Sequence, residues 1–148
     1  PAVTSAWRTM VSDDSGVSWT TSATEIEGGN EGQVALAPNG SLVANLRVHV
    51  VPPADAAERF DDTLRAGRSL EGLRFLSWSH DEGATWSAPL SSTFERLGGD
   101  CEGSMVRVPG RDLLLFSTPY ARSRALCRSA RCNLVVLGSA DSGASDAV

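Results

Sequence analysis

Lysine is absent from this 148-residue chain, and all 13 basic residues are arginine. This absence excludes Schiff-base chemistry and a phosphate-binding P-loop lysine. The 18 acidic residues outnumber the basic ones, and the net charge of -5 argues against a nucleic-acid surface, which normally needs a basic excess. A genome-wide composition bias is the simplest explanation of the missing lysine. Every basic side chain is nevertheless a planar guanidinium group, which suits the recognition of carboxylates.

Cysteine, histidine and long apolar runs are also scarce. The three cysteines and two histidines lack the spacing of a zinc site, and three thiols are too few for a disulfide scaffold. A bridge between Cys127 and Cys132 stays open, and we expect no metal and no cofactor. No run approaches the roughly 20 apolar residues of a membrane-spanning helix, so we expect no membrane span. Residues 1–5 show no leader segment, and the compartment is unknown from them.

The chain does contain a repeated turn motif, S-x-D-x-G-x-[S/T]-W. It occurs at 12–19 and 79–86, and a third copy at 139–145 keeps four fixed positions but is followed by Asp146 instead of tryptophan. We expect the Asp to accept hydrogen bonds from backbone N–H groups about two residues further on, the Gly to adopt positive φ and the Trp to pack the turn onto a sheet. The copies start 67 and 60 residues apart, at the long end of the range for propeller blades.

Short alternating or apolar runs predict strands between these turns. They lie at 33–36, 42–51, 73–78, 104–108, 112–117 and 133–138. Turn signals such as Asn39-Gly40 separate them. The polar stretch 54–73 is interpreted as an insertion loop with one helical turn. We see no domain boundary, so 1–148 is treated as part of a single domain.

The turn motif resembles the Asp box, or BNR repeat, of sialidases (neuraminidases) and related β-propellers. After the first box, Glu31-Gly32-Gln33 and the run 39–47 are similar to the family segments E-x-Q and [D/N]-G-S-L-x-x-N-x-R. In that family the Glu orients and activates a nucleophilic Tyr, and the Arg belongs to a trio that grips the substrate carboxylate. The matching positions are Glu31, implied to be catalytic, and Arg47, implied to bind substrate.

Segments after the second box extend the resemblance. The runs 101–104, 114–119 and 131–134 are similar to the family's C-Q-G-S, L-L-F-S-N-P and R-x-N-L. The resemblance makes Arg131 a second member of the carboxylate clamp. Glu102 stands where the family usually has a substrate-binding Gln, and a carboxylate there would repel an anionic ligand unless an arginine offsets it. We therefore treat Glu102 as a substrate-binding residue whose role is open.

The resemblance implies an all-β fold, a partial six-bladed β-propeller of about two to three blades made of antiparallel four-stranded sheets. Residues 1–148 would be the central portion of such a domain, incomplete at both ends. The implied function is an exo-α-sialidase-like glycoside hydrolase that releases terminal sialic acids from sialylated glycoconjugates by a retaining mechanism. The family's early Arg, acid/base Asp and nucleophilic Tyr have no match, and Tyr120 is in the wrong place for the nucleophile. The family leans to secreted, cell-surface or lysosomal proteins.

Other interpretations stay open. A non-catalytic Asp-box propeller that binds glycans or proteins, and a trans-sialidase, fit the same residues. Arg47 alone could be a surface residue whose stem lies along apolar atoms, and Glu31 a solvated acid in a turn. The arginine-rich run 122–131 lacks the interleaved aromatic residues of a nucleic-acid site.

Overall fold

The structure is a computed structural model that describes residues 5–48, 74–91, 101–119 and 133–143. Within these ranges the chain consists of antiparallel strands and turns, which confirms the all-β class. Several predictions fall outside the described residues: the insertion expected at 54–73, and those for Arg131, Tyr120, Cys127 and Cys132.

Each of the six predicted segments contains a long strand, although the ends differ by a few residues. Five further strands of two residues each were not predicted, because so short a run has no readable alternation. In chain order the strands are β1 (Ala6–Trp7), β2 (Met10–Val11), β3 (Thr20–Thr21), β4 (Ile26–Glu27), β5 (Gly29–Leu36), β6 (Leu42–Val48), β7 (Arg74–Ser79), β8 (Leu90–Ser91), β9 (Ser104–Arg107), β10 (Leu114–Pro119) and β11 (Leu134–Ser139).

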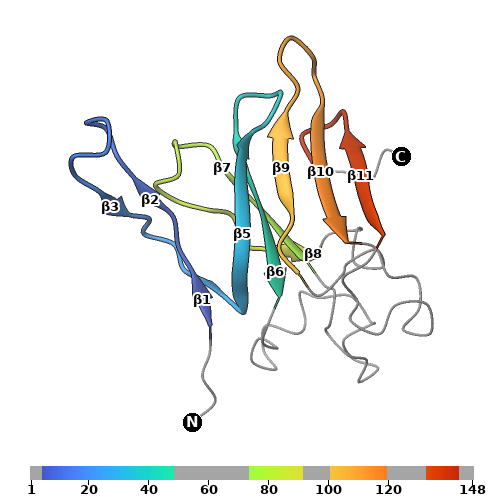
Figure 1. The fold of residues 1–148 in the computed structure, drawn as a ribbon. Helices are drawn as coiled ribbons and strands as arrows, with labels where there is room; N and C mark the ends of the chain where they lie inside the picture. The colour runs from blue at the N-terminus through green and yellow to red at the C-terminus, as the bar shows by residue number, and fades with distance from the viewer. Residues whose placement is uncertain (1–4, 49–73, 92–100, 120–132, 144–148) are drawn as a thin grey trace.

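The strands form sheets that stand side by side, as blades of a propeller do (Figure 1). One sheet has the expected four strands in the order β5-β6-β7-β8, and a second has three in the order β11-β10-β9. Two smaller pairs, β1-β4 and β2-β3, lie toward the N-terminus. The edge strands β5 and β9 pack against each other and bring the two larger sheets together. The described residues therefore form part of a propeller, with one complete four-stranded sheet among them.

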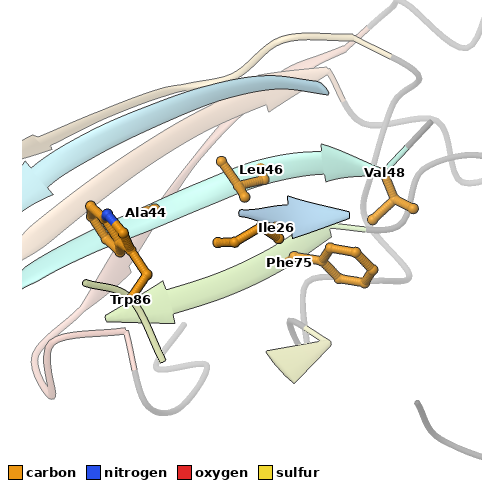
Figure 2. Packing of buried hydrophobic residues seen from close by; sticks show 6 residues of the cluster. All are labelled: Ile26, Ala44, Leu46, Val48, Phe75 and Trp86. Carbon is orange, nitrogen blue, oxygen red and sulfur yellow. The ribbon is translucent and has the colours of Figure 1, made fainter. Parts of the chain in front are cut away.

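The four-stranded sheet has a core on each face, because successive side chains of a strand point to opposite sides. One cluster lies toward β1 and β4 and is shown in Figure 2; its members are Ile26, Ala44, Leu46, Val48, Phe75 and Trp86. The other lies toward β9–β11 and contains Ala35, Ala37, Val43, Leu76 and Leu114. Both faces of β6 are thus buried, and this strand holds the arrangement together.

The repeated motif forms the same turn in its first two copies. Asp14 Oδ1 accepts the backbone N–H of Ser18 at 2.8 Å, and Asp81 Oδ1 accepts that of Thr85 at 2.9 Å. The glycine of each copy has positive φ, about 90° in Gly16 and Gly83, where a side chain would be strained. The turn expectations are confirmed, except that the bonded amide lies four residues after the Asp.

The two motif tryptophans differ in burial. Trp86 is 6% exposed, and its ring N–H donates to Thr9 Oγ1 at 2.8 Å. Trp19 is 56% exposed, so the expectation that it packs onto a sheet is wrong for the first copy. Its ring N–H instead donates to the carbonyl of Gly16 in the same turn at 3.1 Å. Trp7 and Thr9 contact Trp86, whereas the ring of Trp19 is largely open to solvent.

Candidate functional site

Three charged residues lie in a row across β5, β6 and β7. Arg47, near the end of β6, is directly opposite Arg74, the first residue of β7. Glu31 of β5 lies on the other side of Arg47 and accepts a hydrogen bond from it. Directly opposite residues of antiparallel strands project from the same face of the sheet, here the face that packs toward β9–β11. The row therefore lies at one end of the seam between the two larger sheets.

An irregularity in β5 sets the position of Glu31. Gly29 pairs with Val48 but Gly32 pairs with Leu46, so β5 has one residue more than β6 in this interval. Such a bulge re-aims the side chains around it. A Cβ on Gly32 would lie 2.3 Å from Cδ2 of the buried Leu46, so a larger residue at this position would have to displace that side chain. Glycine at position 32 thus lets β5 approach β6 next to Glu31.

Glu31 and Arg47 form an ion pair that is open to solvent on the acid side. Arg47 Nη1 lies 2.8 Å from Glu31 Oε2, and the exposed fractions of the two side chains are 11% and 40%. A largely buried guanidinium group beside an accessible carboxylate can bind an anion and also accept a proton. The structure brings these two predicted residues into contact.

Arg74 is a component of the row that sequence reasoning missed. Its Nε donates to Asn45 Oδ1, its Nη1 donates to the carbonyl of Cys101 at 3.0 Å, and its guanidinium group lies 4.8 Å from the ring centroid of Phe116. The available signal was alternation, because position 74 shares its face with Leu76 and Trp78 and an apolar residue is expected there. A charged residue at an apolar position of a buried strand indicates that its charge has a specific function.

The environment of Arg74 lowers its pKa to about 10, mainly through burial and also through the neighbouring charge of Arg47. The charges of Glu31, Cys101 and Glu102 act in the opposite direction. Arg74 therefore remains a cation at neutral pH. The predicted residues Glu31 and Glu102 thus both act electrostatically on one arginine.

Glu102 lies in a cleft next to this row. Its Oε1 accepts a hydrogen bond from Gln33 Nε2 at 3.0 Å, which joins the loop before β9 to β5. The cleft has a volume of about 440 Å³ and is open to solvent. Its lining residues are Gln33, Glu102, Gly103, Ser104, Ser117, Pro119 and Leu134. A pocket with hydroxyl, amide and carboxylate groups suits a ligand that carries hydroxyl groups.

The motif turn at 79–86 lies at the opposite end of the same strands. Ser79 pairs with Leu42 at the start of β6, whereas Arg74 pairs with Arg47 near its end. The turn and the charged row are thus separated by the length of the strand. Arg131, the other predicted arginine, lies outside the described residues.

Two further properties concern only the described parts of the chain. These ranges contain no group of three or more histidine, cysteine or acidic residues arranged to hold a metal ion. No helix in them has the length and apolar character needed to cross a membrane.

Comparison with known proteins finds solved structures that resemble this chain in fold. No protein-family model matches the sequence, and no curated protein matches it. The Hadza microbial sialidase Hz136 is similar over 93% of this chain and 23% of its own, with a TM-score of 0.59 and 24% identity. A point mutant of the NanB sialidase from Streptococcus pneumoniae is similar over 78% of this chain and 16% of its own, with a TM-score of 0.54 and 21% identity.

A third similar structure is the leech intramolecular trans-sialidase complexed with 2,7-anhydro-Neu5Ac, with a TM-score of 0.49 and 23% identity over 87% of this chain and 16% of its own. The chain thus spans less than a quarter of the length of each of these structures. At this identity the first two likenesses establish the fold, which is that of part of a sialidase β-propeller.

Proposed function

We propose that these residues belong to the substrate site of an exo-α-sialidase-like glycoside hydrolase, which releases terminal sialic acids from glycoconjugates with retention of configuration. The observation that carries the proposal is the 2.8 Å ion pair of Glu31 and Arg47, at the end of the strands opposite the motif turn. The sialidase-like fold supports it. The substrate partner would be a sialylated glycoconjugate.

Arg47 would bind the substrate carboxylate. Sialic acid carries this group at its anomeric carbon, and a planar guanidinium group can donate two parallel hydrogen bonds to it. Arg47 is 9% exposed, so its charge is only weakly screened by water. Arg131 would supply a second guanidinium group to the same carboxylate.

Glu31 would accept the proton of a nucleophilic tyrosine. Most glycosidases attack with a carboxylate, but beside a substrate carboxylate this would bring two anions together; sialidases are an established exception that uses tyrosine. A neutral phenol becomes a good nucleophile when an adjacent base removes its proton. Glu31 is suited to this role because its side chain is 40% exposed while Arg47 fixes one of its oxygens.

Glu102 would contact hydroxyl groups of the sugar from the adjacent cleft. One of its oxygens is held by Gln33 at 3.0 Å, which orients the carboxylate as a hydrogen-bond acceptor. Arg74 acts on Glu102 electrostatically and offsets the repulsion that a second anion in the site would cause. The carboxylate end and the hydroxyl end of the ligand would therefore meet different residues.

The test is hydrolysis of a fluorogenic sialoside by the longest natural polypeptide that contains residues 1–148. Arg47→Lys or Arg131→Lys replaces a planar guanidinium group, which can donate two parallel hydrogen bonds, by an ammonium group. Either change should lower kcat/KM about tenfold to hundredfold. Glu31→Gln removes the base and should lower kcat about hundredfold or more. The matched control is Arg8→Lys, because Arg8 pairs with Glu25 in an exposed bridge whose side chains are 48% and 43% exposed.

Rates that stay unchanged in both Arg47→Lys and Arg131→Lys would contradict the assignment. Binding of sialosides without turnover would favour a non-catalytic propeller. Transfer of the sialic acid to a sugar acceptor, in place of water, would identify a trans-sialidase.

A further inference from the structure

Arg74 is a buried cation beside the proposed substrate site, and the effect on Glu102 alone does not account for its position. Its exposed fraction is 1%, and it is the largest of the fully buried side chains. Removing a charge from water is costly unless hydrogen bonds or opposite charges compensate. An apolar side chain would fill the position at lower cost, so the guanidinium group at this place needs an explanation.

The contacts of Arg74 fix it to three separate elements. It donates to Asn45 on β6 and to the carbonyl of Cys101 before β9, and it lies over the ring of Phe116 on β10. All three partners are neutral groups. Its Nη2 atom is buried and has no hydrogen-bond partner among the described residues. The guanidinium group is therefore held firmly, but its charge is not neutralised by a bonded carboxylate.

This fixed charge faces Arg47. The two residues are directly opposite in the β6–β7 register and project from one face, where like charges repel. Arg47 donates a hydrogen bond to Glu31, on the side away from β7. Hydrogen bonds at Nε and Nη1 fix the guanidinium group of Arg74, so its positive charge stays beside Arg47.

A bound carboxylate would change this balance. Its negative charge beside Arg47 would reduce the repulsion between the two guanidinium groups, so Arg74 would add to the affinity for an anion that it does not touch. The titratable groups that face Arg74 are Arg47, Glu31, Cys101 and Glu102. Of these, only Arg47 is a cation.

We propose that Arg74 is a positioning residue for the substrate carboxylate: its anchored charge directs the Arg47 guanidinium group toward the anion, and its bond to Cys101 holds the segment that carries Glu102 at the adjacent cleft. This inference rests on the proposed function. It assigns Arg74 no contact with the substrate.

The experiment measures the Kd for free sialic acid by calorimetry, in the longest natural polypeptide that contains residues 1–148. Arg74→Met removes the charge and should weaken binding about tenfold, while Arg74→Lys keeps the charge and should weaken it less. Asn45→Asp retains the acceptor of Arg74 Nε, so it should fold, yet it neutralises Arg74 and should also weaken binding about tenfold. Arg8→Met, at an exposed ion pair, is the control for loss of one positive charge.

Enzyme kinetics provide a second readout. On a sialoside substrate the Arg74→Met and Asn45→Asp variants should raise KM more than they lower kcat, because Arg74 acts on binding of the carboxylate. A merely structural role would lower the melting temperature and leave Kd and KM of the folded protein unchanged. If the wild type binds sialic acid, that result would overturn this inference and leave the proposed function intact. A wild type that does not bind sialic acid would overturn the proposed function and this inference with it.

Discussion

Gly103→Ala should loosen the contact between the Glu102 segment and β10. A Cβ at position 103 would lie 2.3 Å from Cζ and 2.5 Å from Cε2 of Phe116, and 2.9 Å from the carbonyl oxygen of Ser117. The ring cannot retreat easily, because Phe116 is 4% exposed and Arg74 lies over it. Overpacking of this kind costs about 1–3 kcal/mol. Partial displacement of the ring from Arg74 costs part of the about 2 kcal/mol of a buried cation–π contact, so we expect a local loss of about 3 kcal/mol.

Amide hydrogen exchange of peptides from β9 and β10 measures this loss directly. Since about 1.4 kcal/mol corresponds to a factor of ten, exchange should become about a hundredfold faster. The control is Gly138→Ala, where the new Cβ meets no atom closer than 3.3 Å and that atom is the end of the Leu113 side chain. Equal exchange in the two variants would refute the reasoning. The polypeptide is again the longest natural one that contains residues 1–148.

Two further predictions concern pH and association. Hydrogen bonds from Ser18 hold the pKa of Asp14 at about 2, so its contribution to stability is present above about pH 4 and is lost as the pH falls through 2. Carboxyl chemical shifts should show the pKa rising in Ser18→Ala and rising less in Ser12→Ala; equal pKa values in wild type and Ser18→Ala would contradict this cause. The isolated 148-residue chain should aggregate, because one face of β9–β11 exposes apolar side chains, and Val136→Thr should reduce light scattering relative to wild type. The exposed apolar residues on that face are Val106, Leu134 and Val136. A monomer that unfolds in one sharp urea transition would contradict the predicted aggregation.

The local sequence pattern is sufficient to explain the contact between Glu31 and Arg47. They are 16 residues apart, on strands that a turn at Asn39-Gly40 joins, so a hairpin alone brings them together. The resemblance to a known family then suggested their roles. Neither the bulge that adjusts Glu31 nor the close approach at Gly32 could be predicted, because both depend on the register between the two strands.

The contacts of Arg74 depend on distant parts of the chain. Its partner Cys101 lies in the loop before β9 and its partner Phe116 lies on β10 of another sheet, and no spacing rule links them to position 74. The burial of Trp86 and the exposure of Trp19 have the same kind of cause, since two copies of one motif meet different neighbours in the fold. Sequence patterns predict the strands, but burial is decided by neighbours.

Because side chains of β6 alternate between two faces, the number of residues in the turn before β6 decides which face each side chain occupies. Arg47 lies between Leu46 and Val48, which both point into the opposite core. A single-residue deletion in the turn at 37–41 would shift β6 by one position, turn Arg47 into that apolar core and turn the two aliphatic residues toward the face of the charged row. Natural or engineered relatives that conserve the ion pair should therefore conserve the number of residues in this turn.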